Sequence, residues 1–440
     1  MSYDECYGST LTEMRARPNI LFVIAGAFLL LAPLSSATAL EGGTALKIAR
    51  LATTLLIVTL GVVFYRCFYL RPAFGSFMAF VFLFVLAACW STSPAWGLFH
   101  KGMFALTVLC GGCLGYSVRD FEDLRKGMRW LSMVAALAAF AVAYFYLKNP
   151  AQAVRGDRLS LWGMNANTIG QTAAPLWMFC LYLGLHERSR WWKAVGFGVS
   201  LLLTLIILGT GSRAACVMAA TGGFFLALPF IKRPAIFALL TVTAIAGMVI
   251  FQSLRPEEIT GVGRMSEDLL KDTRSGIWSY AIKQFLDSPV IGQGWLHWGT
   301  RSANVMNIYL HTIAETGVFG GVMLFASLAI VALRMLKMFT IAARSNIDKS
   351  TPFLALAFMA APLVHGLAES ATFLGTSINA LMLGFGIALI DRIPEMAQSK
   401  RPSFRHIDRI RKSTTSSGRG VVVVRLRKRS NRVQLRQLHK

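Results

Sequence analysis

The chain has 440 residues, of which 55% are hydrophobic and 15% charged, and its mean hydropathy is +0.54. This composition is too apolar for a soluble domain and excludes a water-soluble enzyme. Lys and Arg number 45 against 21 Asp and Glu, a net charge of +24. About half of that charge lies in a tail, because the segment from Ser399 onward holds 14 basic residues and one acid. Basicity confined to a tail and to loops gives no reason to expect a nucleic-acid partner.

Apolar runs of membrane-spanning length recur along the chain, which predicts an all-α integral membrane protein with about twelve transmembrane helices. The first run follows Arg15 and Arg17 as in a signal peptide. It is long enough to span a membrane and many more spans follow, so we interpret it as the first anchor. The predicted spans are 19–40, 47–65, 73–90, 102–118, 128–147, 163–186, 192–209, 213–231, 234–253, 304–333, 352–370 and 373–390.

Basic residues occur in every second loop, and loops of this kind face the cytoplasm. The charge pattern therefore predicts a cytoplasmic N-terminus (1–18), a polytopic membrane domain (19–391) and a basic cytoplasmic tail (392–440). One long loop, at about 254–303, is predicted to be external. The tail is rich in Ser, Arg and Lys, and we expect it to be disordered or bound to anionic lipid headgroups, with a cytoplasmic protein or RNA as the alternative partner.

The seven cysteines do not form a secreted disulfide framework, because their number is odd and most lie in apolar runs. Cys110 and Cys113 have the spacing of a redox or zinc pair. No second pair or nearby His accompanies them, so close helix packing through the two intervening glycines is the favoured interpretation.

Arginines in the predicted external loops are exceptions to the rule that basic residues occur in cytoplasmic loops, and they need an anionic partner. Arg213 begins a span directly after Ser212, which can cap the helix, so the amino end of that helix and the guanidinium can act together on a phosphate. The alternative is an arginine that reaches the lipid headgroups from a helix end. The predicted external set comprises Arg155, Arg158, Arg213, Arg264, Arg274 and Arg301.

The long external loop contains an amphipathic helix. Arg274 lies at its start, and Asp287 and Pro289 end it. Trp278 on this helix has two interpretations, an anchor in the membrane interface or a platform on which a sugar stacks. The expected apolar face comprises Ile277, Trp278, Ala281, Ile282, Phe285 and Leu286.

Several short motifs follow one another between about residues 150 and 390. They are Arg158 with Asn165 and Asn167; Gly211-Ser212-Arg213; Arg274 to Trp278; Pro289 to Gly294; Asn307 to Leu310; and Glu315 to Gly320. This order, with the long external loop before Asn307, resembles the O-antigen ligase and polymerase superfamily of bacterial envelopes. The resemblance implies an enzyme of the bacterial inner membrane that uses undecaprenyl diphosphate-linked glycans on the external side. Ligases pass the glycan to lipid A core, and polymerases pass it to another repeat unit.

The resemblance assigns diphosphate binding to Arg213 and Arg274. Arg158 is a third candidate, which loop chemistry alone also explains as a turn residue. A lipid diphosphate is already a good leaving group, so the enzyme must hold the diphosphate, place the acceptor hydroxyl and accept its proton. This chemistry needs no nucleotide, and no metal is needed where arginine neutralises the charge. We therefore expect no cofactor.

The expected base is replaced, because Met306 precedes Asn307 where ligases usually have His. His311 does not simply substitute, since in a continuous helix it faces about 140° away from Met306. His311 does share a face with Asn307 and Glu315, and His365 with Glu369 forms a similar pair. Each His is a candidate base or acceptor contact, and a hydrogen bond between helices is the alternative.

Met306 shifts the expectation from ligation toward polymerisation or exopolysaccharide production. Two other classes remain open. A flippase or transporter of lipid-linked oligosaccharide could also use arginines for a diphosphate, but it predicts broken helices in matching halves. A nonenzymatic component of a polysaccharide-export complex is favoured if Met306 marks loss of catalysis.

Overall fold

The computed structural model is mostly helical, with two short β-hairpins. It describes residues 19–34, 43–65, 71–155, 158–161, 164–230, 275–295, 297–298, 301–302, 305–345, 350–369 and 377–399. Two compact units divide the chain, Met1–Met396 and Ala397–Lys440. The described residues belong almost entirely to the first unit, and the predicted basic tail from 400 onward lies outside them.

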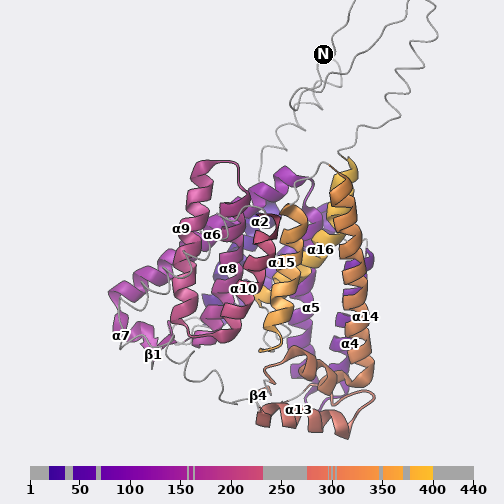
Figure 1. Cartoon of the computed structure of the whole chain (residues 1–440). Helices are drawn as coiled ribbons and strands as arrows, with labels where there is room; N and C mark the ends of the chain where they lie inside the picture. Colours follow the sequence, from indigo (N-terminus) through magenta and orange to yellow (C-terminus); the bar gives the residue numbers. More distant parts are fainter. Residues whose placement is uncertain are drawn as a thin grey trace, which may run out of the picture. The chain divides into compact units, whose positions relative to one another are not determined.

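A helix lies in each predicted span that the described residues include (Figure 1). Seven of the helices in this part of the chain are long and apolar enough to cross a membrane, and α2 and α15 are shorter apolar helices. The predicted span at 234–253 lies outside the described residues, so the total of twelve stays a prediction. The helices are α2 (Ile20–Leu34), α3 (Gly43–Tyr65), α4 (Pro72–Leu86), η1 (Ala87–Trp90), α5 (Pro94–Ser117), α6 (Phe121–Lys148), α7 (Pro150–Ala153), α8 (Ala166–His186), α9 (Arg190–Gly209), α10 (Arg213–Ala227), η2 (Leu228–Phe230), α13 (Ser275–Asp287), α14 (Ile308–Arg344), α15 (Ser350–His365) and α16 (Ile378–Ser399).

Several helices are longer than the apolar windows that predicted them. Helix α5 begins at Pro94 rather than at 102, and α6 begins at Phe121 rather than at 128. Helix α16 continues to Ser399, past the expected end at 390. Polar residues can continue a helix past the apolar window where their side chains or backbone groups find hydrogen-bond partners. At the start of α6, for example, the Asp120 side chain caps the helix by accepting from the N–H groups of Glu122 and Asp123.

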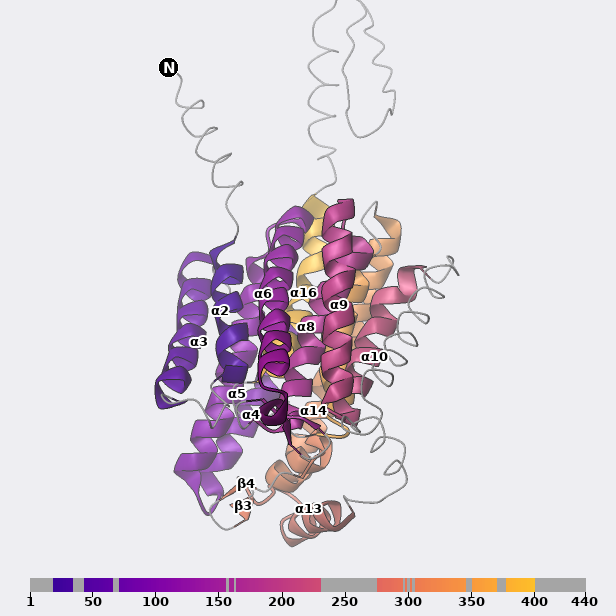
Figure 2. The same ribbon diagram turned by 90° about the vertical axis from the view of Figure 1, so that its left-hand side faces the viewer.

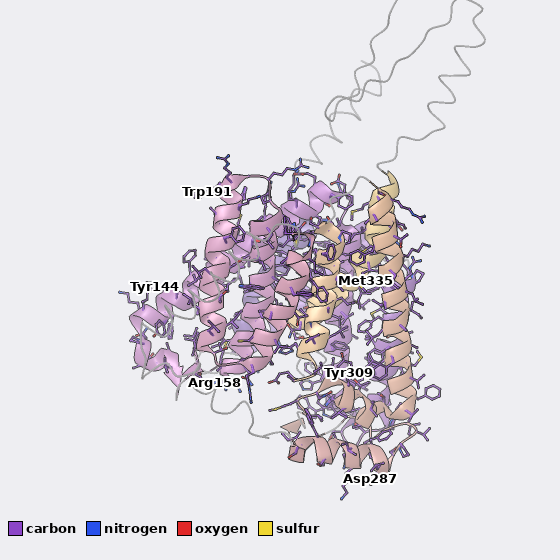
Figure 3. The ribbon with its side chains drawn as sticks, in the orientation of Figure 1. Tyr144, Arg158, Trp191, Asp287, Tyr309 and Met335 are labelled. Atoms are coloured by element: carbon purple, nitrogen blue, oxygen red, sulfur yellow. The ribbon has the colours of Figure 1, made fainter. Side chains whose placement is uncertain are left out.

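The bundle has two distinct ends (Figure 2). At the end that we call the site end, α8, α10 and α14 begin and α9 and α15 finish. Figure 3 shows Arg158, Tyr309 and Asp287 at this end and Trp191 at the other, which we call the basic end. The two hairpins also belong to the site-end loops: β1 (Val154–Arg155) pairs antiparallel with β2 (Arg158–Leu159), and β3 (His297–Trp298) pairs with β4 (Arg301–Ser302).

One buried carboxylate joins four helices at the basic end. Asp391 of α16 accepts hydrogen bonds from the N–H groups of Ala73 and Phe74 in the first turn of α4, both at 3.1 Å. It also accepts from the hydroxyl of Tyr116 in α5 and from Arg334 in α14, both at 3.3 Å. Such a charge is costly inside an apolar bundle, and these donors offset that cost.

Helices α5 and α16 approach each other through glycine. A β-carbon placed on Gly111 would lie 2.1 Å from the carbonyl oxygen of Leu381, and one on Gly384 would lie 2.2 Å from that of Val108. Cys110 and Cys113 are buried beside this crossing. The structure therefore agrees with the packing interpretation of the Cys-Gly-Gly-Cys segment.

Helix α14 is broken at Gly317, whose φ of 65° and ψ of −165° are not helical. The break frees backbone groups on both sides, and a loop formed by residues 289–294, which we call the break loop, satisfies them. On the later side, the N–H of Val318 donates to the carbonyl of Pro289 at 2.8 Å. The N–H of Phe319 donates to the carbonyl of Val290 at 3.4 Å.

The break loop also satisfies the earlier side of the break. The N–H of Gln293 donates to the carbonyl of Ala314 at 3.0 Å, and that of Gly294 donates to the carbonyl of Glu315 at 2.9 Å. A β-carbon on Gly292 would lie 2.3 Å from the carbonyl carbon of Glu315. The part of α14 before the break, Ile308–Thr316, is thus a separate short segment that the break loop holds in place.

The amphipathic helix predicted in the external loop is present as α13. Its Ala281 is buried in a cluster with Val305 and with Ala314 of the short segment. Trp278 and Phe285 pack against this cluster while half-buried. Ile282 and Leu286, which were assigned to the same apolar face, are instead 47% and 66% exposed. The predicted face is therefore wider than the strip that packs on α14.

We predict that Gly111→Ala lowers the stability of the protein by about 1–3 kcal/mol, because the added methyl group overlaps a backbone carbonyl of α16. Gly102→Ala is the matched control in the same helix, since a β-carbon there meets nothing within 4 Å. SDS titration of detergent-solubilised protein, followed by tryptophan fluorescence, measures both variants. Equal stability of the two variants would contradict the close crossing.

Candidate functional site

Arg158 connects three chain segments at the site end. Its Nε donates to the carbonyl oxygen of Thr210, in the turn between α9 and α10, at 2.7 Å. Its Nη2 donates to the Asn167 Oδ1 in the first turn of α8. The guanidinium is partly buried. Arg158 therefore has two specific partners in the fold, which is more than the turn interpretation requires.

Asn167 extends this connection to an acid. Its Nδ2 donates to Glu369 Oε1 at 3.2 Å. Glu369 follows α15 and is 4% exposed. A guanidinium, an amide and a carboxylate thus lie in sequence across β2, α8 and the end of α15. Sequence reasoning grouped Arg158 with Asn167 but did not place Glu369 beside them, because it comes from a distant part of the chain.

The segment from Thr210 to Arg213 forms the start of α10, as the sequence predicts. Gly211 has a φ of 57°, which lets the chain turn tightly out of α9. The Ser212 side chain caps α10 by accepting from the N–H of Ala215 at 3.4 Å. Arg213 is the first residue of α10 and is half-buried. Its guanidinium and the amino end of α10 therefore share the site end with Arg158.

Asn307 caps the short segment of α14. Its Oδ1 accepts from the N–H groups of Tyr309 and Leu310 at 3.0 and 3.1 Å. Its Nδ2 donates to the carbonyl of Leu367, beyond α15, at 3.2 Å. Asn307 thus joins the first turn of α14 to the segment that carries Glu369.

Met306 lies outside the helix. Its φ of 52° makes it the one non-glycine residue with a left-handed backbone in the described part of the chain. The expectation that placed His311 about 140° from Met306 assumed a continuous helix, and it is wrong because α14 begins at Ile308. His and Asn adopt this backbone conformation several-fold more often than most residues, so the position suits the His that the resemblance leads one to expect.

His311 and Glu315 form a buried ionic cluster with Lys101 of α5. His311 Nε2 lies 3.2 Å from Glu315 Oε1, and Lys101 Nζ lies 2.9 Å from Glu315 Oε2. All three side chains are fully buried. Lys101 also lies 4.3 Å from the ring centroid of Phe84, in cation–π geometry.

Sequence reasoning missed Lys101 because the predicted span began one residue after it, which made it appear to be a flanking cation. The structure places it in the second turn of α5, which begins at Pro94. A lysine at the edge of one apolar run and a glutamate inside another predicted span were the available signal.

His365 is the last residue of α15 and is fully buried. Its Nδ1 lies 3.5 Å from Nδ2 of Asn379 in α16. Its carbonyl accepts from the N–H of Glu369 at 3.0 Å. His365 and Glu369, which the sequence analysis paired, therefore lie one turn of chain apart at the site end.

The remaining predicted residues divide into two groups. Arg264 and Arg274 lie outside the described residues, so the proposed role of Arg274 stays a prediction. Arg155 and Arg301 lie in β1 and β4. In the part of the chain that is described, no three His, Cys, Asp or Glu side chains lie close enough together to hold a metal ion.

Residues 197–325 match the family model of the O-antigen ligases. This segment is therefore similar to the O-antigen ligase domain. This match confirms the resemblance to the O-antigen ligase and polymerase superfamily, and the apolar helices make the protein a multi-pass membrane protein. No curated protein matches the chain.

The O-antigen ligase match and the site overlap only in part. Arg213, Asn307 and Glu315 lie within the matched segment, whereas Arg158 and Glu369 lie outside it. The structure brings both groups to the site end. Polar residues from helices on each side of the matched segment therefore lie at the same end as those within it.

We predict that Lys101→Met destabilises the protein by about 3–5 kcal/mol, because it leaves the Glu315 carboxylate buried without its cation. Adding Glu315→Gln to that variant removes the uncompensated charge and should restore most of the stability. Lys148→Met at the exposed end of α6 is the control. If the single and double variants unfold at the same SDS fraction, Lys101 and Glu315 are not coupled.

Proposed function

We propose that the protein transfers a glycan from an undecaprenyl diphosphate-linked donor to a growing polysaccharide or to lipid A core. The reaction takes place at the site end, on the external face of the bacterial inner membrane, with both termini in the cytoplasm. The observation that carries this proposal is the convergence of Arg158, Asn167, Glu369 and the start of α10 at one end of an O-antigen ligase domain.

The donor diphosphate is the group that this convergence suits best. Arg213 begins α10, where the unpaired N–H groups and the dipole of the helix favour an anion. Arg158 is fixed nearby through the carbonyl of Thr210. As the glycosidic bond to the diphosphate breaks, negative charge grows on the leaving oxygen. Fixed guanidinium groups stabilise that charge without reorganising, and Arg274 is a further proposed contributor.

The acceptor hydroxyl must lose a proton as its oxygen attacks the sugar. Of the two predicted histidines, His365 is the better candidate for the base. Only one turn of chain separates it from Glu369, which Asn167 links to Arg158. His311 contacts Glu315 instead, and we propose that it positions the short segment of α14 with Lys101. Glu369 is the second candidate for the base.

Met306 favours polymerisation over ligation to lipid A core. The backbone at this position accommodates His, and the Asn307 cap is intact, so the surroundings of the family base are retained while the base itself is absent. A chain that extends a polysaccharide with a base elsewhere is consistent with this arrangement. The acceptor in this proposal is therefore the end of a growing polysaccharide.

We predict that Arg213→Ala and Arg158→Ala each lower glycan transfer by about 10²- to 10³-fold, because the leaving diphosphate loses charge stabilisation. Lysine at position 213 should restore only part of the activity, since it lacks the planar fork of arginine. Arg190→Ala, at the basic end, is the control. The assay compares polysaccharide and lipopolysaccharide ladders from a deletion strain at matched membrane levels of each variant. Normal polymer from both site variants would exclude the proposed donor site.

We predict that His365→Ala lowers chain growth by about 10²- to 10⁴-fold, the usual contribution of a general base. Met306→His should leave chain growth unchanged and should create no transfer to lipid A core. The same ladders report both products. Transfer of glycan to lipid A core by Met306→His would instead identify the protein as a ligase that has lost its histidine.

A further inference from the structure

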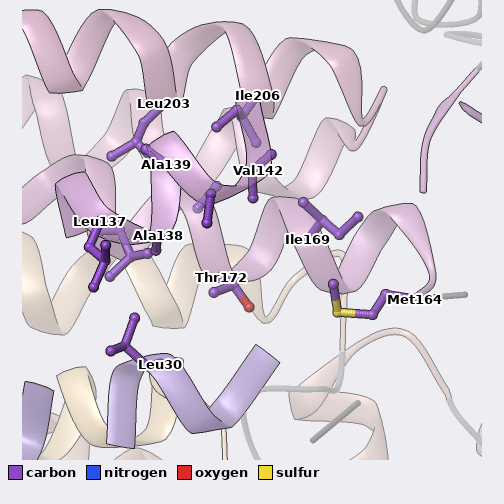
Figure 4. Close-up of a pocket in the computed structure, with 13 residues that line it drawn as sticks. Leu30, Leu137, Ala138, Ala139, Val142, Met164, Ile169, Thr172, Leu203 and Ile206 are labelled. Atoms are coloured by element: carbon purple, nitrogen blue, oxygen red, sulfur yellow. The ribbon is translucent and has the colours of Figure 1, made fainter. Parts of the chain in front are cut away.

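An apolar cavity of about 290 Å³ lies between α2, α6, α8 and α9 (Figure 4). Leu30 of α2 and Leu137 of α6 line it on one side, and Ile169 of α8 and Ile206 of α9 line it on the other. Thr172 is the only polar residue among those that line it. Its hydroxyl donates to the carbonyl of Thr168 at 2.9 Å, so the cavity wall offers no unsatisfied polar group.

One wall of the cavity belongs to a helix with an exposed apolar face. The C-terminal part of α6 leans away from α8 and α9, and Figure 3 shows Tyr144 at the outer edge of the protein. Leu137, which lines the cavity, is 60% exposed, and Phe140 in the next turn is 61% exposed. In a membrane, exposed apolar side chains on a spanning helix face lipid. A hydrocarbon chain can therefore enter this cavity directly from the bilayer.

The residues that line the cavity also lie close to the polar site along the chain. Met164 lines it and directly precedes Asn165, the cap of α8. Ile169 lies two residues after Asn167, which accepts a hydrogen bond from Arg158. Arg158 also binds the carbonyl of Thr210, at the end of α9 beyond Ile206. The guanidinium thus joins the ends of the two helices whose side chains form one wall of the cavity.

We propose that this cavity receives the polyprenyl chain of the lipid diphosphate donor, an inference that rests on the proposed function. The diphosphate then lies at Arg158 and Arg213, and the chain attached to it runs along α8 into the cavity. Alanines contribute to both sides, with Ala138 and Ala139 on α6 and Ala173 on α8, which leaves width for a chain that carries methyl branches. Burial of apolar surface in the cavity adds affinity for the chain that the arginines alone do not supply.

Ala138→Phe tests the proposal by filling the cavity. Ala143→Phe makes the same change on α6 at a residue that does not line the cavity, and it is the control. Binding of labelled undecaprenyl diphosphate and farnesyl diphosphate is measured in nanodiscs of phosphatidylcholine and phosphatidylglycerol. We expect Ala138→Phe to weaken undecaprenyl diphosphate binding by about tenfold, and farnesyl diphosphate binding by less, because the lost contacts are to the long chain. Equal undecaprenyl diphosphate affinity in both variants would overturn the proposal.

A photoreactive polyprenyl diphosphate bound to the unmodified protein gives a second test that does not depend on a variant folding. Crosslinks should map to the lining residues of α6, α8 and α9. Crosslinks confined to other helices, or the same crosslinks from a photoreactive phosphatidylglycerol, would refute the assignment. Glycan transfer by the wild-type protein is assayed separately. If the protein transfers glycan but no crosslink maps to the cavity, only the proposed polyprenyl-chain site is rejected. If the protein transfers no glycan, the proposed function is rejected.

Discussion

The exchange of backbone hydrogen bonds between the break loop and α14 is the interaction on which the site depends. Inside a membrane no water satisfies free N–H and C=O groups, so a helix can break there only where other protein groups replace the lost bonds. Pro289, Val290, Gln293 and Gly294 provide those partners through their backbones. Two motifs of the O-antigen ligase domain that are separate in sequence, 289–294 and 315–320, are therefore parts of one structural element.

This element fixes the short segment of α14 in position. Its first turn is tied to the segment that follows α15 by Asn307 and by the N–H of Ile308, which donates to the carbonyl of Gly366 at 2.8 Å. Its last turn is tied to α5 by the ion pair of Glu315 with Lys101. The segment is thus held at both ends and along its packed face, so it presents Met306 in a defined place. In a transporter, paired helix breaks in matching halves would surround an open path for the substrate. At the break in α14, the backbone of the break loop instead occupies the space beside the broken helix.

The sequence allowed prediction of features that depend on local chemistry. Apolar runs located the helices, Ser212 was recognisable as a helix cap, and the pattern after Arg274 predicted α13. Contacts between distant segments could not be derived in the same way. Neither Lys101 beside Glu315 nor Glu369 beside Asn167 follows from spacing, because the chain path between these residues is set by packing of whole helices. The left-handed backbone of Met306 was not predicted either.

The break in α14 also separates two requirements that one long helix could not meet together. The part from Val318 to Arg344 is about 40 Å long at 1.5 Å per residue, which exceeds the roughly 30 Å hydrocarbon core of a bilayer. A helix of that length must tilt or project from the hydrocarbon region. Because Gly317 interrupts the helix, the long part joins the short segment through one non-helical residue and the hydrogen bonds of the break loop. We infer that a change in the tilt of the long part reaches Asn307 only through this junction, and not along a continuous helix.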